Sequence, residues 1–580
     1  MNEQRNMFLA IVLSAIVLLG WSVLSQRWLP TANPPATKTV DGKQVPLPKP
    51  QASPGGPAAV PGTVAASNVI RDRNVVLAES PRVAIETPRL KGSINLKGAR
   101  IDDLVLTTQR ESIAKDSPPI RLLSPAGSPD AYYATIGWTG EGPALPGADT
   151  VWKASGTRLA PGSPVTLSWD NGQGQRFQIA LSIDDGYMFT ANQVVMNAGK
   201  APLAVRPFSL ISRASASKDP DPWTAHVGAV GVFNNAANYE WGFKDLDESG
   251  DQRFNSTGGW LGFTDKYWLT AIAPAQGSKI DAGFLKSANQ PYQAIFTPET
   301  VVLAPAKAAN YRSHLFAGAK EIELLDRYQD ELGIAKFDKA IDWGWFEWFM
   351  KPIFSLLRWL YATIGNFGLA IICLTFIVRL LMFPVAQKQF KSMAGMRVLQ
   401  PKMKALQERH KEDKPRLQQE MLKLYQEEKV NPMAGCLPIL IQIPIFYALY
   451  KTLLLSVEMR HKPFVLWIKD LSSPDPLTPV NLFGYLDFTP PHFLALGILP
   501  ILLGISMYLQ FKLNPPPADP VQAQVFGLMP WVLMFVMAPF AAGLVVYWIT
   551  NNCLTILQQK WLYSRYPGMK APATPTAGVK

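Results

Sequence analysis

An arginine lies within a long apolar stretch of this sequence, where a charge is costly and needs a reason. Arg379 stands in the run GNFGLAIICLTFIVRLLMFP, residues 365–384, which holds no other charged residue. An Arg at the centre of a membrane-spanning helix costs about 2.5–3.5 kcal/mol on insertion scales. The residues alone leave two interpretations: the long side chain snorkels to a nearby membrane surface, or the charge serves a hydrated cavity.

Polar side chains in other apolar runs favour the second interpretation. Thr375 precedes Arg379 by four residues, which places both on one face of a helix. Gln442, Asn551 and Asn552 interrupt two further apolar runs. Such groups must face one another or water rather than lipid, so the runs predict helices around a hydrated, positively charged cavity.

Acidic side chains are absent from the apolar runs after residue 359, which argues against an ion-coupled pump. Lys451, a further charge in these runs, lies near the end of its run, and we expect it to snorkel there. The chain contains no P-loop, HExxH, nucleophile elbow or Gly-rich dinucleotide turn. The nearest carboxylate pair, Asp184 and Asp185, would point to opposite faces of a strand. The sequence therefore predicts no enzyme, no metal site and no cofactor.

The elements that position these residues are helices long enough to cross a bilayer, which needs about 20 apolar residues. Apolar runs occupy 359–383, 433–457, 494–513, about 523–538 and about 541–560. Another run, Met7 to Leu24, is too long for a signal-peptide core and ends in a poor cleavage site. We expect residues 1–29 to form an uncleaved anchor, which makes six membrane spans.

The loops between the runs differ in charge and predict the orientation. Residues 384–432 hold eleven Lys and Arg against six Asp and Glu, whereas residues 458–493 hold three against four. The tail, 566–580, has basic residues and no acid. Because Lys and Arg gather in cytoplasmic loops, 384–432 and both termini are predicted to be cytoplasmic.

The segment 384–432 has its own periodic pattern, which predicts a helical hairpin of two amphipathic helices packed antiparallel. The chain carries a net charge of +12, and this segment holds part of the excess. Its basic surface suits a partner with phosphates, either lipid headgroups or ribosomal RNA. A solvated hairpin that only sets the topology is the alternative. The candidate contact residues are Lys402, Lys404, Arg409 and Lys411.

The region between the anchor and the other runs has two parts. Nine prolines between residues 30 and 62 indicate a disordered linker, 30–67. From 68 to 340, short segments of alternating polarity between turn residues predict an antiparallel β-sandwich, with a helix near 318–334. Residues 341–358 are rich in Trp and Phe and predict an amphipathic helix in the membrane interface, with a core helix as the alternative.

The apolar runs resemble the YidC family of bacterial membrane protein insertases. The similarity lies in NPMAGCLPILIQIPIFYALY (431–450), in the Arg379 run and in GLVVYWITNNCLTILQQ (543–559). The order of anchor, linker, β-domain and helical core, 359–565, is similar to the Gram-negative form. The resemblance implies an inner-membrane protein with a periplasmic supersandwich domain. It also implies a hydrophilic groove that is open to cytoplasm and lipid.

The resemblance further implies which residues contact a substrate. The groove arginine of the family matches Arg379, and its polar neighbour matches Thr375. The other implied contacts are Gln442, Ile443, Pro444, Phe446, Tyr547, Trp548 and Asn551.

The function that we expect is insertion and folding of nascent membrane proteins without ATP. The implied partners are nascent chains, the ribosome, the Sec translocon and anionic phospholipids. A small-solute transporter or channel that uses the same cavity is the alternative.

Overall fold

The structure is a computed structural model that describes residues 37–40, 43–46, 70–141, 144–218, 225–287, 290–344, 346–387, 399, 401–403, 405–406, 408–410, 413–428, 437–486, 496–513 and 520–565. The chain forms two compact units. We call Asn33–Gly344 the β-domain, and Trp345–Lys580 together with Met1–Ala32 the helical domain. Each is described by itself. The predicted anchor, 1–29, and the predicted tail, 566–580, lie outside the described residues.

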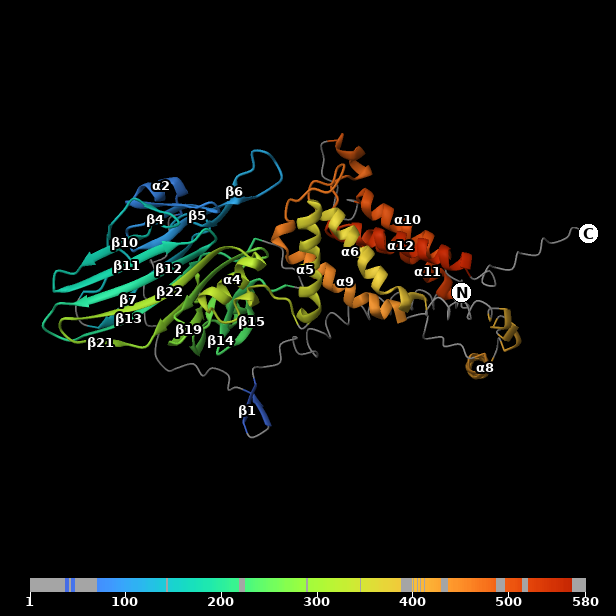
Figure 1. Cartoon of the computed structure of the whole chain (residues 1–580), viewed down its shortest axis with the longest axis horizontal. Coiled ribbons are helices and arrows are strands. Elements are labelled where there is room, and N and C mark those ends of the chain that lie inside the picture. The colour runs from blue at the N-terminus through green and yellow to red at the C-terminus, as the bar shows by residue number, and fades with distance from the viewer. Residues whose placement is uncertain are drawn as a thin grey trace, which may run out of the picture. The chain divides into compact units, whose positions relative to one another are not determined.

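Two large sheets form the β-domain (Figure 1). The strands of the first sheet are β8 (Lys153–Ala154), β10 (Val165–Asp170), β11 (Gln175–Ile183), β12 (Met188–Asn197), β14 (Gly228–Phe233), β15 (Ala236–Gly242), β17 (Trp260–Thr264), β18 (Trp268–Pro274) and β22 (Lys307–Ala319). They are ordered β15-β14-β17-β18-β22-β12-β11-β10-β8, and neighbouring strands run antiparallel.

The strands of the second sheet are β3 (Arg82–Glu86), β4 (Leu90–Asn95), β5 (Arg100–Arg110), β6 (Pro119–Leu123), β7 (Tyr132–Glu141), β9 (Arg158–Leu159), β13 (Leu203–Arg213), β16 (Gln252–Thr257), β19 (Lys279–Leu285), β20 (Tyr292–Pro298) and β21 (Val301–Leu303). Nine of them follow the order β16-β19-β20-β13-β7-β5-β4-β3-β9, while β21 pairs with β13 and β6 with β5. The predicted all-β domain is confirmed.

The core of the β-domain lies between the two sheets, where alternate side chains of each strand meet. Along β12, buried residues alternate with half-buried ones, as a strand with one covered face requires. Trp138 of β7 meets Phe177 of β11 edge to face, with ring centroids 5.2 Å apart. In β11 the apolar residues Phe177, Ile179 and Leu181 occupy the buried positions, as the alternating polarity of the sequence predicts.

A buried ion pair also joins the two sheets. Arg213 of β13 donates two hydrogen bonds to Asp265, which follows β17, at 2.9 and 2.8 Å. The guanidinium lies over the rings of Tyr132 and Phe243, 4.8 and 4.9 Å from their centroids. Burial raises the pKa of the Tyr132 hydroxyl to about 12. Two parallel hydrogen bonds between the guanidinium and the carboxylate thus compensate the burial of both charges.

Three α-helices and a short 3₁₀ helix accompany the sheets: α2 (Arg73–Ala78), α3 (Phe243–Ser249), α4 (Ile322–Leu332) and η1 (Phe337–Ala340). The helix predicted near 318–334 begins later because Gly318 and Ala319 still belong to β22. It ends at Gly333, whose φ of 66° suits a glycine.

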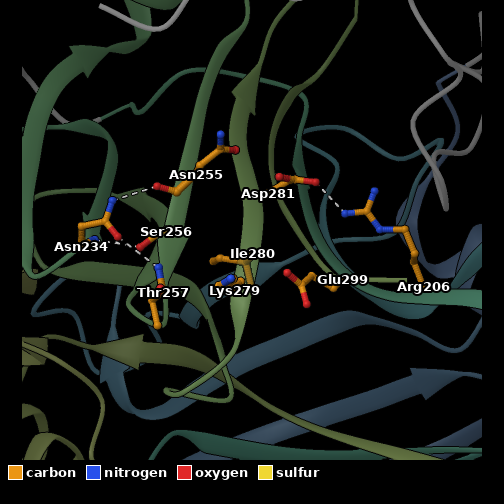
Figure 2. A pocket seen from close by; sticks show the side chains of 9 residues that line it. All are labelled: Arg206, Asn234, Asn255, Ser256, Thr257, Lys279, Ile280, Asp281 and Glu299. Atoms are coloured by element: carbon orange, nitrogen blue, oxygen red, sulfur yellow. Dashed lines mark hydrogen bonds and ion pairs between the residues drawn. The ribbon is translucent and has the colours of Figure 1, made fainter. Parts of the chain in front are cut away.

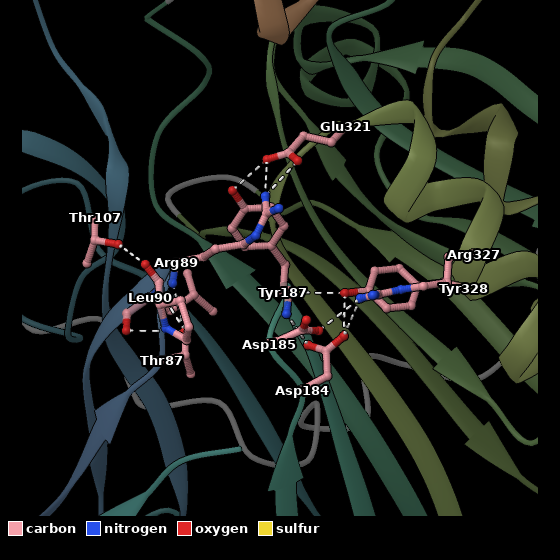
Figure 3. A network of polar contacts seen from close by, with 12 residues as sticks. Thr87, Arg89, Leu90, Thr107, Asp184, Asp185, Tyr187, Glu321, Arg327 and Tyr328 are labelled. Atoms are coloured by element: carbon pink, nitrogen blue, oxygen red, sulfur yellow. Dashed lines mark hydrogen bonds and ion pairs between the residues drawn. The ribbon is translucent and has the colours of Figure 1, made fainter. Parts of the chain in front are cut away.

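A polar network attaches α4 to strands that are distant in sequence (Figure 3). The Tyr328 hydroxyl donates to Asp184 at 2.6 Å and accepts from the backbone N–H of Tyr187 at 3.0 Å. Glu321, just before α4, accepts from the Tyr187 hydroxyl at 2.9 Å and from Arg89 at 2.6 Å. Burial raises the pKa of Tyr187 to about 12. These contacts give Asp184 a structural role.

The helical domain contains α5 (Glu347–Ile364), α6 (Phe367–Leu381), α8 (Lys414–Glu427), α9 (Leu437–Leu455), α10 (Ile498–Leu513), α11 (Pro520–Val536) and α12 (Ala542–Arg565), with short 3₁₀ helices η3 (Val457–Met459) and η4 (Pro479–Gly484). Helix α12 packs against α6 and α10, while α5 packs against α6 and α9. The apolar runs after residue 359 therefore form helices, as predicted, although one of these runs is divided between two helices.

The prediction of one continuous helix over 359–383 was wrong. Helix α5 ends at Gly365, the C-cap residue, which has a φ of 78°. Asn366 then caps α6, because its side chain accepts a hydrogen bond from the backbone N–H of Leu369. The predicted interfacial helix, 341–358, corresponds to α5, which begins at Glu347 and absorbs the first residues of the run.

The described part of 384–432 brings residues from its two ends together. Leu399, Met403 and Leu424 are buried together. Lys402 forms an ion pair with Glu428, beyond the end of α8. Early residues of the segment thus lie close to late ones. The antiparallel hairpin and its cytoplasmic position stay predictions.

The number of membrane spans also stays a prediction. Within the described ranges, no helix combines the length and the hydropathy needed to cross a membrane.

The linker prediction, 30–67, needs one correction. Thr37–Val40 (β1) and Lys43–Pro46 (β2) form a two-stranded antiparallel sheet. The sequence carries a signal for this hairpin, because Asp-Gly separates two short segments that contain β-branched residues. The remainder of the predicted linker up to residue 67 lies outside the described residues.

Candidate functional site

Arg379 lies in the last turn of α6, and its side chain reaches α12. Its Nε donates to Oδ1 of Asn551 at 2.7 Å, and its Nη2 donates to Oγ1 of Thr555 at 2.6 Å. A longer contact of 3.4 Å joins Nη2 to the backbone oxygen of Asn551. The side chain is half-buried. Among the described residues, no carboxylate contacts the guanidinium, so neutral acceptors hold a full positive charge.

Two further polar residues bring α12 together with α10. Asn552, only 3% exposed, donates from Nδ2 to Oγ of Ser506 at 2.9 Å. Asn551 is 7% exposed and faces Arg379. Successive asparagines therefore point to two different neighbouring helices. Each buried amide therefore has a hydrogen-bond partner, which it would lack if it faced apolar side chains or lipid.

Thr375 lies apart from this cluster, although the sequence placed it on the face of Arg379. It is 1% exposed, and its hydroxyl donates to the backbone oxygen of Ile371 at 2.6 Å. Its hydrogen is therefore used within α6. No contact between Thr375 and Arg379 is found in the described part of the chain.

Aromatic side chains bring together two other predicted site residues. Phe446 of α9 lies against Trp548 of α12, with ring centroids 4.9 Å apart. Tyr547, in contrast, is 2% exposed. Ile443 is 56% exposed and Pro444 half-buried, whereas the side chain of Gln442 lies outside the described residues. The predicted set thus divides into a polar contact between α6 and α12 and an aromatic contact between α9 and α12.

The position of Lys451 differs from the expectation. It was expected to snorkel to a surface, yet it is only 2% exposed within the helical domain. The neighbouring Thr452 is fully buried. The residue therefore belongs to the interior of the domain, and we assign it no role in binding.

Thr555 was missed by the sequence analysis. A Thr in a helix is ordinarily satisfied by the backbone oxygen four residues earlier, and Thr555 does donate to Asn551 at 2.7 Å. Its spacing of four residues from Asn551 was the available signal, because this spacing puts both residues on one face. The packing of α6 against α12 is needed to see that this face meets Arg379.

The basic residues predicted on the hairpin differ in their surroundings. Lys402 and Arg409 are both exposed, and Lys402 is paired with Glu428. Lys404 and Lys411 lie outside the described residues.

The β-domain contains a cavity of about 300 Å³ on its second sheet (Figure 2). Arg206 in its wall donates to Asp281 at 2.6 Å and to the backbone oxygen of Pro298 at 2.8 Å. Asn234 donates to the backbone oxygen of Asn255 at 2.8 Å. These polar groups hold strands and turns together, and we assign the cavity no ligand. Among the described residues, no group of three or more His, Cys, Asp or Glu is arranged to hold a metal ion.

The chain thus combines an all-β domain with a helical domain that holds an arginine among neutral acceptors. This combination is compatible with a membrane protein that has a large domain outside the membrane, and a family model matches each of the two domains. The model of the 60Kd inner membrane protein matches residues 359–570. The model of the YidC periplasmic domain matches residues 82–356. The chain belongs to the YidC family, which confirms the resemblance seen in the sequence.

Relatives extend this similarity over nearly the whole chain. The membrane protein insertase YidC of Zymomonas mobilis subsp. mobilis is 50% identical over 97% of this chain and 96% of that protein. The membrane protein insertase YidC of Methylorubrum extorquens (strain PA1) is 44% identical over 98% and 96%. A crystal structure of an active YidC insertase with its first transmembrane domain resolved is 18% identical. It covers 87% of this chain and 95% of its own, with a TM-score of 0.36.

Proposed function

We propose that this protein inserts nascent proteins into the bacterial inner membrane through a groove that contains Arg379. Family membership supports the general activity. The observation that carries the proposal is the positive charge of Arg379, which Asn551 and Thr555 hold without neutralising it.

The physical problem of insertion is the passage of a hydrophilic tail. Each unsatisfied polar group in hydrocarbon costs several kcal/mol, so a wet groove that reaches partway through the bilayer shortens the costly distance. A fixed positive charge in that groove holds water and attracts acidic side chains more strongly than in bulk, since the local dielectric is lower.

The apolar segment of the substrate supplies the driving force. Burial of apolar surface contributes about 25 cal/mol per Å², and the aromatic contact of Phe446 with Trp548 offers it an apolar path. A membrane potential adds roughly 2.3 kcal/mol per charge per 100 mV for acidic tails that move outward. No nucleotide is needed in this scheme.

The proposed arrangement has six spans, both termini and the hairpin in the cytoplasm, and the β-domain in the periplasm. The charge of the loops supports this orientation. The hairpin would meet the ribosome or anionic phospholipids. Cooperation with the Sec translocon is part of the proposal.

The test compares wild type, Arg379→Lys and Arg379→Ala in proteoliposomes without nucleotide, with a short-tailed single-span substrate. We expect the Lys variant to insert and the Ala variant to fail. Insertion by the Ala variant at the wild-type rate would refute a role for the charge. A strict need for added nucleotide would refute the scheme, and solute flux through the proteoliposomes would favour a channel.

A further inference from the structure

We propose that Thr555 is a positioning residue that fixes the guanidinium of Arg379 for the acidic tail of a substrate protein. The proposal rests on the insertase function proposed above and adds a positioning residue to it. It begins from the hydrogen bond of 2.6 Å between Nη2 of Arg379 and Oγ1 of Thr555.

The orientation of the Thr555 hydroxyl is already decided within its own helix. A hydroxyl has one hydrogen and two lone pairs. The hydrogen is donated to the backbone oxygen of Asn551 at 2.7 Å. The lone pairs are therefore left to accept from Arg379, so the hydroxyl acts as a preoriented acceptor.

Asn551 supplies the second point of attachment. Its Oδ1 accepts from Nε of Arg379 at 2.7 Å. Asn551 and Thr555 are one helical turn apart on α12, so they meet the same edge of the planar guanidinium. Two hydrogen bonds along one edge fix both the position and the plane of the group.

The opposite end of the guanidinium keeps its donors for a ligand. Within the described residues, Nη1 of Arg379 makes no hydrogen bond, and the side chain is half-buried rather than closed off. A carboxylate can accept from Nη1 in a charge-assisted hydrogen bond, which is stronger than one to a neutral acceptor. The geometry thus suits an Asp or Glu side chain better than a neutral one.

Thr550 provides a matched control on the same helix. Its hydroxyl donates to the backbone oxygen of Val546 at 2.8 Å, as the hydroxyl of Thr555 donates to Asn551. Both residues are half-buried. Only Thr555 also accepts from Arg379, so the pair separates positioning from the general effect of a Thr in α12.

The experiment measures insertion by the full-length protein in proteoliposomes for two substrates. One has Asp and Glu in its short tail, and the other has Asn and Gln at the same positions. The variants are Thr555→Val, Thr555→Ser, Thr550→Val and Arg379→Ala.

For Thr555→Val, we expect the ratio of acidic-tailed to neutral-tailed insertion to fall about tenfold, the effect of one hydrogen bond to a charged group. Thr555→Ser restores the acceptor and keeps the wild-type ratio, as does Thr550→Val. Thermal unfolding in detergent checks the fold of each variant. If Thr555→Val does not fold, Thr555→Ala gives the same comparison without a branched side chain.

A wild-type ratio in Thr555→Val, or an equal loss in Thr555→Val and Thr555→Ser, would overturn the positioning role. So would an equal loss for both substrates, because that result reports a structural defect. Arg379→Ala distinguishes this failure from that of the groove itself. If that variant inserts both substrates like wild type, the groove mechanism fails, whatever Thr555 does.

Discussion

Arg379 and Asn551, which are far apart in sequence, are joined by a hydrogen bond of 2.7 Å from Nε to Oδ1. A neutral amide thus holds a cation where a carboxylate would bind it more strongly. Asparagine and aspartate have nearly the same shape, so a single substitution at residue 551 changes the charge and little else.

Asn551→Asp is expected to reduce the insertion of acidic-tailed substrates. The new carboxylate would pair with Arg379 and cancel the charge that attracts the tail, while it holds the guanidinium at least as firmly. The measurement is the rate of insertion in proteoliposomes as acidic residues are added to the tail. Wild type should gain from each added acid, and the variant should not. A variant that still gains would show that net charge at this site is unimportant.

The sequence predicted the polar residues of the site better than their partners. Arg379 and Asn551 were recognisable because polar groups in apolar runs are costly. Thr555 was not, because a Thr can satisfy itself within one helix. Thr375 was placed on the face of Arg379 by spacing alone, yet its hydroxyl binds its own helix. The contacts between helices depend on packing of segments that are far apart in the chain. A local sequence pattern does not predict these contacts.

The sequence predicted those parts of the fold where a polarity pattern extends over many residues. Alternating polarity predicted the β-domain, because a strand with one covered face has a period of two. Strands β14, β17 and β18 are buried at every residue, so alternation did not mark them. The order of twenty strands in two sheets did not follow, since pairing joins distant segments. The break at Gly365 was missed because hydropathy is continuous across it, although glycine before asparagine is a helix stop followed by a cap.

Arg213→Met is expected to destabilise the β-domain strongly. Arg213 and Asp265 are each 8% exposed, and the substitution leaves a buried carboxylate without its partner. The cost of such a change is about 3–5 kcal/mol. Thermal unfolding of the full-length protein, with hydrogen exchange of the β13 amides, measures it.

The double variant Arg213→Met with Asp265→Asn is the control for that result. It removes both charges, so it should be more stable than Arg213→Met alone, because the desolvated carboxylate is gone. If the double variant is the less stable of the two, the loss in Arg213→Met comes from packing against Tyr132 and Phe243 instead.

His314 of β22 is expected to make the β-domain less stable in mild acid. Burial, with help from the nearby positive charge of Arg312, lowers the pKa of His314 to about 4. In an unfolded chain the pKa is about 6.5, so between these values only the unfolded state takes up the proton. Stability from this residue is therefore complete above pH 6.5 and is lost as the pH falls from about 6.5 to about 4.

His314→Gln tests this pH dependence. Glutamine does not titrate, so the variant should lose less stability than wild type across that pH range. The shift corresponds to at most about 3 kcal/mol. Hydrogen exchange of the paired strands β12 and β22, corrected for the intrinsic rate at each pH, gives the measurement. Equal pH profiles for the two proteins would assign the acid sensitivity to other groups.

The basic residues of the hairpin are expected to contribute unequally to ribosome binding. Both side chains are exposed, but Lys402 forms an ion pair with Glu428, whereas Arg409 forms none with a described residue. Since affinity for phosphates comes from cations that are free to displace counterions, Arg409→Gln should weaken binding more than Lys402→Gln. Glu428→Gln should strengthen binding, because it releases Lys402.

Co-sedimentation of the detergent-solubilised protein with ribosomes, over a series of salt concentrations, measures these affinities. If the three variants bind like wild type at low salt, the hairpin's charge sets only the topology, because a phosphate partner would respond to each change.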